Sequence, residues 1–344
     1  MKYPVFLRRY EMVATNKLPA RYMITRSVPV SFDKGVSLEE LWEMHHSGME
    51  EYRLVLRSID TGTYSLRPSI SGPSLFDLKV AILEKMLESC CFCEHRCGIN
   101  RKYNEKGYCR VGAVSRYASE FLHRGEEPEL VPSHTIFFTG CVFSCAYCQN
   151  WDIATHPEKG KIADPMELAR SIEIRRRQGA RNVNFVTPTP HPHTVLNIIG
   201  NLSVNIPVIW NSNMYHSQEV KELLEGVVDM YLADLKYGND RCAEKYSKVH
   251  DYMQVVTGNL TTAYSDAEIL LRHLVLPGHL HCCTMPAVKW VAENIPHIRF
   301  NLMFQYNPHY LADIYPEMNR QLTAEEMEKA MQMVISSGLE DVLF

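Results

Sequence analysis

From about residue 134 onward the sequence alternates between short apolar runs and helical stretches, and this alternation constrains the fold more than any other feature. The six apolar runs occupy residues 135–140, 182–187, 207–212, 229–236, 268–276 and 298–306. Helical or mixed segments separate them at 166–179, 195–202, 218–226, 240–265 and 287–295, and a last helical pattern follows at 323–338. Strands that alternate with helices predict a parallel sheet covered by helices, and continuous apolar runs are typical of strands buried on both faces.

Six strand–helix units predict an α/β fold, namely a partial (β/α)6 TIM-like barrel of parallel strands with an N-terminal Cys-rich extension. We expect a mostly helical or irregular N-terminal extension at 1–75, a Cys-rich metal-binding segment at 76–130 and the barrel domain at 131–344. Two helices are expected before the barrel, one opened by a capping box at Ser37 and one at 75–87. Ligands of such sheets bind at the C-terminal ends of the strands, so polar residues there are candidate site residues.

The composition is that of an ordinary globular protein, with 46% hydrophobic and 22% charged residues. The formal net charge of −4 lacks the basic footprint of nucleic-acid binders and disfavours an RNA substrate. No apolar run approaches the length of a membrane span, and the start, MKYPVFLRRYEM, lacks the apolar block of a signal peptide. We therefore expect a cytoplasmic protein without a membrane or nucleic-acid partner.

Three cysteines, Cys141, Cys145 and Cys148, lie in the stretch TGCVFSCAYCQN, directly after the first predicted strand. Three thiolates on one short loop can bind three irons of a [4Fe–4S] cluster and leave the fourth iron open, whereas most protein cubanes use four cysteines. The alternatives are a zinc site completed by His156 and three buried thiols without a metal. The missing fourth cysteine favours the cluster with an open iron.

A second set of cysteines precedes the barrel in the spacing C-x2-C-x3-C-x11-C. Its members are Cys90, Cys93, Cys97 and Cys109, with Cys91 as an additional candidate. Four thiolates can close either an auxiliary [4Fe–4S] cluster or a structural zinc site, and free thiols are the remaining alternative. Cys242, Cys282 and Cys283 show no ligand spacing, and we interpret them as ordinary residues.

The C-x3-C-x2-C loop after the first strand of a barrel resembles the radical S-adenosylmethionine (SAM) superfamily. The segments QNWDI, NVNFVTPTPH, DMYLADLKYGND, KYS, LLRHLVLPGH and LMFQYNP follow in order, and together they resemble PflX-type proteins, which are similar to pyruvate formate-lyase activating enzyme. The resemblance implies that Cys141, Cys145 and Cys148 hold a [4Fe–4S] cluster whose open iron binds SAM. It also implies reductive cleavage of SAM to a 5′-deoxyadenosyl radical, which abstracts hydrogen from a substrate.

The resemblance further implies an electron donor such as ferredoxin or flavodoxin, and an oxidoreductase that acts on a protein, a peptide or a small molecule. Tyr147, just before the third cysteine, corresponds to the residue that lies near adenine. Many members carry a Gly-Gly-Glu motif after the second strand, where this chain has Val186-Thr187-Pro188-Thr189. The hydroxyls of Thr187 and Thr189 could instead accept from the SAM ammonium group, unless this run is only a rigid turn.

Polar residues at later strand ends complete the candidate SAM site. Asn213 could bind the ribose or the SAM carboxylate or only shape a turn, and Gln305 could line the adenine or substrate pocket. Asp234 and Lys236 point to one side of their strand and match the Asp-x-Lys pattern of activating enzymes, although a plain ion pair is the alternative. Arg272 lies in an apolar strand and needs an acidic partner, which could be SAM or the substrate.

Two other functions remain compatible with these motifs. A non-catalytic iron–sulfur electron carrier or redox sensor would not bind SAM, and it would gain nothing from an open iron. A zinc-stabilised binding module would use its cysteines only for structure. The three-cysteine loop therefore favours a radical enzyme over both alternatives.

Overall fold

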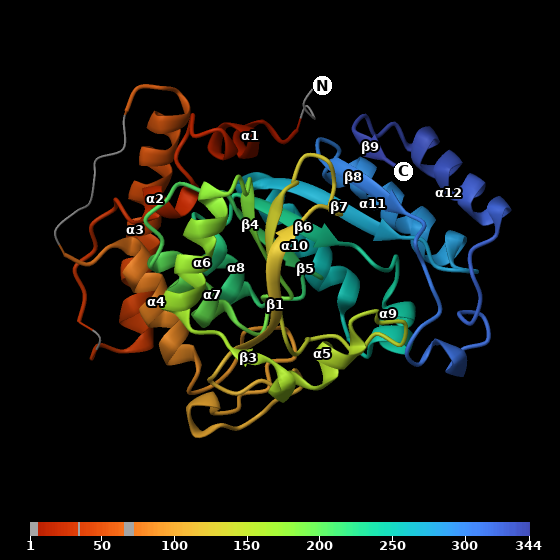
Figure 1. The fold of residues 1–344 in the computed structure, drawn as a ribbon, viewed down its shortest axis with the longest axis horizontal. Helices are drawn as coiled ribbons and strands as arrows, with labels where there is room; N and C mark the ends of the chain where they lie inside the picture. Colours follow the sequence, from red (N-terminus) through yellow and green to blue (C-terminus); the bar gives the residue numbers. More distant parts are fainter. Residues whose placement is uncertain (1–5, 34, 65–71) are drawn as a thin grey trace.

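The computed structural model describes residues 6–33, 35–64 and 72–344, so residues 1–5, 34 and 65–71 of the expected extension lie outside the described residues. Within the described residues, the strands form one sheet in the order β3-β1-β2-β4-β5-β6-β7-β8-β9 (Figure 1). The strands are β1 (Arg116–His123), β2 (Ser133–Phe138), β3 (Lys161–Ile162), β4 (Asn182–Val186), β5 (Val208–Ser212), β6 (Met230–Asp234), β7 (Glu268–Leu274), β8 (Arg299–Met303) and β9 (Val342–Leu343).

The six apolar runs of the sequence are strands β2, β4, β5, β6, β7 and β8, and neighbours in this series pair in parallel. The register places Ile136 beside Phe185 and Phe185 beside Trp210, so buried apolar side chains of neighbouring strands meet on one face of the sheet. Because β3 and β9 are the two edges of the sheet, the barrel is not closed. The predicted partial (β/α)6 barrel is confirmed.

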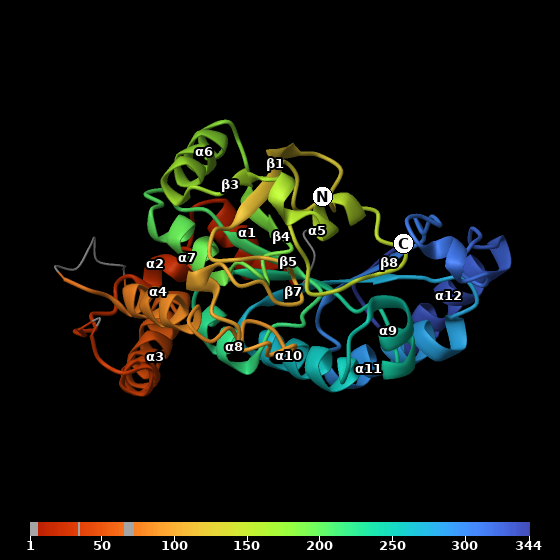
Figure 2. The ribbon, with the colours of Figure 1, turned by 90° about the horizontal axis from the view of Figure 1, so that it is seen from below.

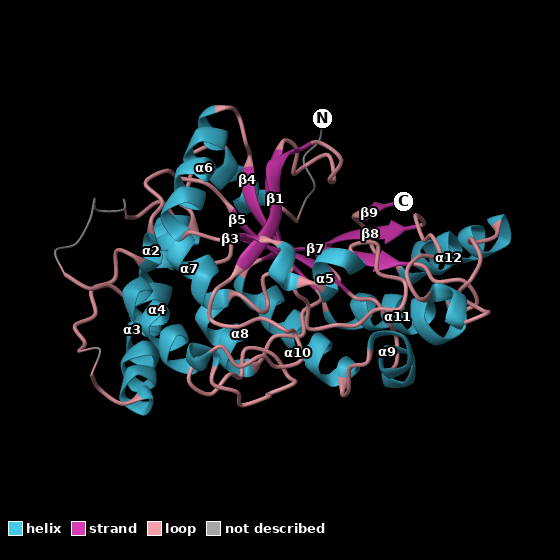
Figure 3. Ribbon diagram, turned by 60° about the horizontal axis from the view of Figure 1, so that its bottom comes forward, coloured by secondary structure: helices cyan, strands magenta, loops and turns pink. Residues whose placement is uncertain are grey.

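Helices surround the sheet on its outer side (Figure 3). They are α1 (Arg8–Ala14), α2 (Arg21–Thr25), α3 (Leu38–Asp60), α4 (Leu75–Met86), α5 (Trp151–Thr155), α6 (Pro165–Arg177), α7 (Pro192–Gly200), α8 (Gln218–Leu224), α9 (Asp240–Ser247), α10 (Tyr252–Asp266), α11 (Met285–Asn294) and α12 (Ala324–Ser337). Seen from below, α8, α10 and α11 form a row along one side of the sheet (Figure 2). Ser37 closes the expected capping box with Glu40 at the start of α3.

Strand β1 is a feature that the apolar pattern did not predict. It pairs antiparallel to β2, from Tyr117 opposite Phe138 to His123 opposite Ser133. Its sequence, RYASEFLH, is only half-buried along most of its length, so it lacks the continuous apolar run of an inner strand. The loop after β1 carries Glu126 and Glu127 to Arg272 of β7, where both glutamate side chains are almost fully buried.

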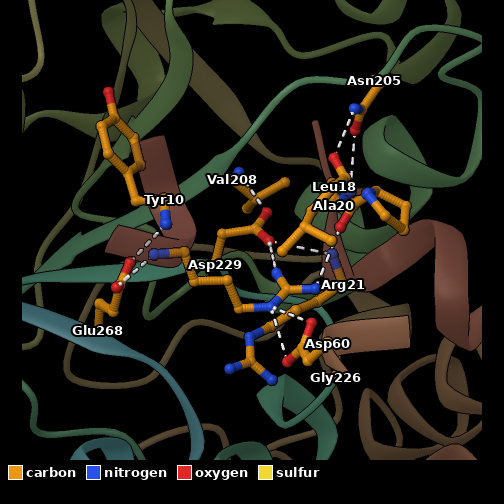
Figure 4. Close-up of polar contacts among 12 residues, drawn as sticks. Tyr10, Leu18, Ala20, Arg21, Asp60, Asn205, Val208, Gly226, Asp229 and Glu268 are labelled. Carbon is orange, nitrogen blue, oxygen red and sulfur yellow. Dashed lines mark hydrogen bonds and ion pairs between the residues drawn. The ribbon is translucent and has the colours of Figure 1, made fainter. Parts of the chain in front are cut away.

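The N-terminal segment closes the end of the barrel opposite the cysteine loop. Tyr10 of α1 is buried in a cluster with Ile209, Met230 and Leu270, which lie at or near the starts of their strands. Backbone amides of the segment bind two carboxylates (Figure 4): Glu268 accepts from the N–H groups of Arg9 at 2.7 Å and of Tyr10 at 2.5 Å. These contacts connect the N-terminal segment firmly to the barrel.

Asp229, just before β6, is the second carboxylate of this junction (Figure 4). It accepts from the backbone amides of Arg21 at 3.0 Å and Val208 at 2.8 Å, and from the Arg9 guanidinium at 3.4 Å. A single buried carboxylate thus links residues from the N-terminal segment to β5 and β6. Several hydrogen bonds to one carboxylate compensate for the water that a buried charge loses.

The docking of α1 is expected to weaken as the pH rises. Burial raises the pKa of Glu268 to about 7, so the folded protein binds more protons than the unfolded chain between about pH 4.5 and 7. The free energy of unfolding contributed by this group therefore falls as the pH rises through that window, and levels off above it. The free energies of unfolding of wild type and Glu268→Gln, measured by thermal unfolding from pH 4.5 to 8, test this prediction. If the two proteins lose stability equally as the pH rises, Glu268 does not make the expected contribution.

Within residues 6–33, 35–64 and 72–344, no helix combines the length and the apolar character that a membrane span requires.

Candidate functional site

The three-cysteine loop begins at the C-terminal end of β2, where Gly140 packs closely against the Cys-rich segment. Gly140 has φ +80°, and a Cβ there would meet the Cys109 carbonyl oxygen at 2.9 Å and Val111 at 2.5 Å. The loop is then fixed to the end of α9, because the Ser144 amide donates to the Ser247 carbonyl at 3.0 Å and the Ala146 amide to the Tyr246 carbonyl at 2.7 Å. Both ends of the loop are thus positioned by backbone contacts.

The three cysteines of this loop are partly buried, and all of them line one cavity. The Phe143 amide donates to Cys141 Sγ at 3.4 Å, and Ser247 Oγ lies 2.9 Å from Cys145 Sγ. Burial and, second, the neighbouring Cys145 together raise the pKa of Cys148 to about 12. Burial likewise raises the pKa of Cys141 and Cys145. Thiols in such a site become thiolates only when a nearby cation compensates the charge, which is what a metal centre does.

A cavity of about 460 Å³ opens beside these thiols at the C-terminal ends of the strands. Its size falls within the usual range of small-molecule sites. All predicted SAM-contacting residues line it together with the three cysteines; these residues are Tyr147, Thr187, Thr189, Asn213, Asp234, Lys236, Arg272 and Gln305. The structure thus brings together residues that are spread over more than 150 positions of the sequence, while their roles toward SAM stay predictions.

Asp234 and Lys236 form an ion pair of 2.8 Å at the end of β6. Burial opposes the charge of Lys236, but Asp234 and Cys145 outweigh it and raise the pKa of the ammonium. Lys236 is therefore charged at neutral pH and lies on the side of the cavity that holds the thiols. The alternation of β6 explains this placement, since Asp234 and Lys236 lie on its inner side while Leu235 is fully buried on the other.

Tyr147 and Asn213 each contact another residue of the site. The Tyr147 hydroxyl donates to Tyr237 at 2.9 Å, and its ring lies 5.8 Å from that of Tyr306. Asn213 Nδ2 is 3.9 Å from Cys141 Sγ, while its Oδ1 accepts from the Tyr215 amide at 3.3 Å. The expected turn-forming role of Asn213 is therefore present, and it coexists with a place on the cavity wall.

Arg272 lines the cavity and is held by two glutamates. Its Nε donates to Glu127 at 2.7 Å, its Nη2 pairs with Glu127 and with Glu126, and Asn301 donates to Glu127 at 2.7 Å. Although burial opposes ionisation, Arg272 and Asn301 lower the pKa of Glu127. The acidic partner that the sequence required for Arg272 is thus supplied from the loop after β1, and the predicted contact of Arg272 with SAM or substrate stays a prediction.

The second set of cysteines gathers beside the three-cysteine loop. Cys90, Cys93 and Cys109 are buried, and burial followed by the charges of the other thiols raises the pKa of Cys93. A Cβ at Gly107 would lie 2.5 Å from Cys97 Sγ, so only glycine fits against this thiol. Arg101, fully buried, places Nη1 3.9 Å from Cys90 Sγ and donates to the Gly112 and Pro190 carbonyls. A buried cation beside buried thiols suits an anionic metal–thiolate centre.

Comparison with known proteins decides the family. The family model described as the radical SAM superfamily matches residues 135–315, more than half of the chain. "Uncharacterized protein MJ0674" of Methanocaldococcus jannaschii is 43% identical over 343 residues, which covers 97% of this chain and 98% of that protein. The chain belongs to the radical SAM superfamily. Members of this superfamily are enzymes, and membership implies a [4Fe–4S] cluster and SAM as cofactors.

Solved structures also resemble this radical SAM protein. A domain of pyruvate-formate lyase-activating enzyme from Bacteroides vulgatus aligns with TM-score 0.38 and 15% identity, covering 46% of this chain and 93% of that domain. SuiB from Streptococcus suis, in a structure bound to S-adenosylmethionine, aligns with TM-score 0.40 and 11% identity, covering 92% of this chain and 68% of SuiB.

The residues of this radical SAM protein fit the cofactors that its family implies. Among the described residues, Thr189 Oγ1 has no hydrogen-bond partner although it is buried on the cavity wall. Thr187 has φ +58°, an unfavourable backbone conformation for a β-branched residue, and strain of this kind is often found at ligand sites. A buried hydroxyl without a partner costs free energy unless a ligand supplies one. The cavity therefore fits a ligand with polar groups beside the three thiols.

One group of potential ligands escaped the sequence analysis of this radical SAM protein. Cys242, His279 and Cys282 place one ligand atom each within 4.8 Å of the others. Cys242 lies on α9 and the other two lie after β7, so no local spacing joins them. The sequence analysis interpreted Cys242 and Cys282 as ordinary residues, whereas the structure brings them together with His279.

Proposed function

We propose that this protein is a radical SAM enzyme of the activating-enzyme type, in which Cys141, Cys145 and Cys148 hold the [4Fe–4S] cluster and the adjacent cavity binds SAM. The observation that carries the proposal is that three partly buried cysteines and the unpartnered Thr189 hydroxyl line one cavity. When bound, the cluster and SAM supply a 5′-deoxyadenosyl radical that abstracts a hydrogen atom from the substrate.

The chain's own residues would hold and orient these groups. The Phe143 amide and the Ser247 hydroxyl stabilise the thiolates of Cys141 and Cys145. The Thr189 hydroxyl and the carboxylate of Asp234 can accept hydrogen bonds from an ammonium group, and Lys236 can bind a carboxylate. Both ends of an amino acid moiety would thus find complementary charges on one wall of the cavity.

A protein or peptide substrate is favoured by the surface beside the cavity. Leu311 and Ile314 expose their apolar side chains in the segment after β8, and Tyr310 stacks on Trp151 with ring centroids 5.2 Å apart. The Leu311 amide donates to the Ala146 carbonyl at 2.8 Å, so this surface adjoins the three-cysteine loop. Exposed apolar side chains next to an active site are typical of sites that bind macromolecules.

We also infer that Cys90, Cys93, Cys97 and Cys109 bind an auxiliary [4Fe–4S] cluster, which would accept electrons from a donor such as ferredoxin or flavodoxin. Two clusters give about eight irons per chain and one gives about four, so iron counts distinguish this from zinc at the second site. The Cys-rich segment contacts the three-cysteine loop, since His95 hydrogen-bonds the Val142 carbonyl at 2.8 Å. This proximity supports electron transfer between the two centres.

Anaerobically purified protein is expected to release 5′-deoxyadenosine and methionine from SAM when dithionite is added. The electron carrier and the binding module described above predict no cleavage, so this measurement separates all three functions. Peptides with deuterated α-carbons then test the substrate class, because abstraction transfers deuterium to the 5′-carbon of the product. A protein with its full iron content that never cleaves SAM would contradict the proposed function.

A further inference from the structure

We propose that Cys242, His279 and Cys282 bind a divalent metal ion of the zinc type, separate from the cysteine sets described above. Their ligand atoms lie within 4.8 Å of one another. Ligand atoms on a tetrahedral zinc ion lie roughly 3.5–3.8 Å apart, as follows from Zn–S bonds of about 2.3 Å and Zn–N bonds of about 2.0 Å. Side-chain movements of about 1 Å would therefore close the site.

The chemistry of the donors selects the metal. Two thiolates and an imidazole are soft and borderline ligands, which favour zinc over the oxygen-seeking magnesium and calcium ions. Three protein donors leave the fourth position of a tetrahedron to another ligand, and Cys283 Sγ lies next to the group, 4.0 Å from Cys282 Sγ. Cys242 and His279 are buried and Cys282 is partly exposed, so the ion has a closed site with an entry path from solvent.

Surrounding residues already orient the ligands. The Nδ1–H group of His279 donates to the Pro277 carbonyl at 2.7 Å, so Nε2 is the ring nitrogen left for a metal. Nε2 of His279 lies 3.0 Å from the Tyr246 hydroxyl, and a bound metal would replace this contact. The Tyr246 hydroxyl would then keep its other hydrogen bond, of 2.6 Å, to Glu317. Asn239 Nδ2 lies 3.3 Å from Cys242 Sγ and 3.7 Å from Cys283 Sγ, where it would stabilise thiolate charge.

Two backbone segments, the turn at Leu280–Thr284 and the loop after β6, pack closely together at the site. Residues Leu280–Thr284, which carry Cys282 and Cys283, form a π-helix, a rare conformation that is frequent at functional sites. A Cβ at Gly238 would lie 2.5 Å from the Cys283 carbonyl oxygen, so glycine allows the loop after β6 to pack against this turn. The two loops meet although 40 residues separate Cys242 from Cys282.

The metal would fix α9 against the turn that precedes α11, two segments that lie side by side (Figure 2). Cys242 is near the start of α9, and Ser247 at its end touches Cys145 of the three-cysteine loop at 2.9 Å. Because α9 is short, a metal at its start restrains the residues at its end. The proposed ion therefore supports the loop that holds the catalytic cluster and takes no part in the reaction itself.

Metal analysis of protein purified anaerobically from zinc-supplemented cells tests the site. Cys242→Ser and Cys282→Ser are each expected to lose about one zinc per chain with unchanged iron, whereas Cys145→Ala, a cysteine variant outside the group, should lose iron and keep the zinc. In the wild type, X-ray absorption at the zinc edge should show sulfur at about 2.3 Å and nitrogen at about 2.0 Å. Wild-type protein without zinc, or zinc contents equal in all four proteins, would overturn the proposal.

Alkylation of the wild type provides a test that needs no variant. With zinc bound, Cys242 and Cys282 are expected to resist a thiol reagent, and a zinc chelator should make both reactive, as mass spectrometry of the labelled peptides reports. Equal labelling with and without the chelator would mean that the group is a reactive thiol–imidazole pair without a metal. That outcome would overturn the metal site and leave the proposed radical chemistry untouched.

Discussion

The Cys145→Ala variant is expected to lose about four irons per chain and to release 5′-deoxyadenosine at least about 100-fold more slowly than wild type. Substitutions in the outer shell of a metal site typically cost about 10–100-fold, and loss of a ligand should cost more. Cys145 is central in its loop, since it neighbours both other thiols and contacts Ser247. Iron determination and product quantification after dithionite reduction measure both effects.

Cys91→Ser is the comparison for this variant, because Cys91 is a partly buried cysteine of the Cys-rich segment that does not line the cavity. It should keep the cluster at the three-cysteine loop and the cleavage of SAM. Cys93→Ala should lose metal from the second site only and keep the cluster at the three-cysteine loop. Cleavage of SAM at the wild-type rate by Cys145→Ala would refute the cluster assignment.

Replacement of Arg272 by alanine is expected to destabilise the fold by about 3–5 kcal/mol, because it leaves Glu126 and Glu127 without their cation. The side chains of the two glutamates are only 7% and 4% exposed, so water cannot take over the role of the guanidinium. For a chain of this length, about 1 kcal/mol corresponds to roughly 1–2 °C. Differential scanning calorimetry should therefore show a midpoint about 5 °C lower.

Arg320→Ala provides the comparison on the surface. Arg320 also pairs with a glutamate through two nitrogens, at 2.7 and 2.8 Å to Glu326, but its side chain is 42% exposed. Exposed pairs contribute about 0–1 kcal/mol, so this variant should unfold within roughly 1–2 °C of wild type. Equal midpoints for the two variants would show that the buried network contributes no more than a surface ion pair.

The proposed metal and the Arg272 network lie at different places near the C-terminal ends of the strands. Arg272 and Glu126 line the cavity with Asp234 and Lys236, and Arg272 lies beside Asp234 in the register of β6 and β7. Cys242, on α9, and His279 and Cys282, after β7, do not line the cavity. The polar residues of this fold are thus organised around the C-terminal ends of the strands, as in other parallel α/β sheets.

The sequence by itself determined the parts of this protein that depend on local spacing. Buried parallel strands need continuous apolar runs, so β2 and the five strands parallel to it were predicted from the order of apolar runs along the chain. Cys141, Cys145 and Cys148 can meet because seven positions separate the first from the last. The cavity residues followed from the rule that ligands bind at strand ends, together with the resemblance to a family.

Only the tertiary structure decided which distant residues meet. Arg272 pairs with Glu127, which lies 145 positions earlier in the chain, in the loop after β1. The half-buried sequence of β1 lacks the apolar run by which the other strands were predicted, so this antiparallel strand was not expected. His279 and Cys242 approach each other because parallel strands carry their following loops to the same edge of the sheet. The hydrophobic pattern of a segment shows which of its side chains are buried, but it does not show which other segments they contact. Contacts between distant loops are therefore known only once the order of the strands in the sheet is known.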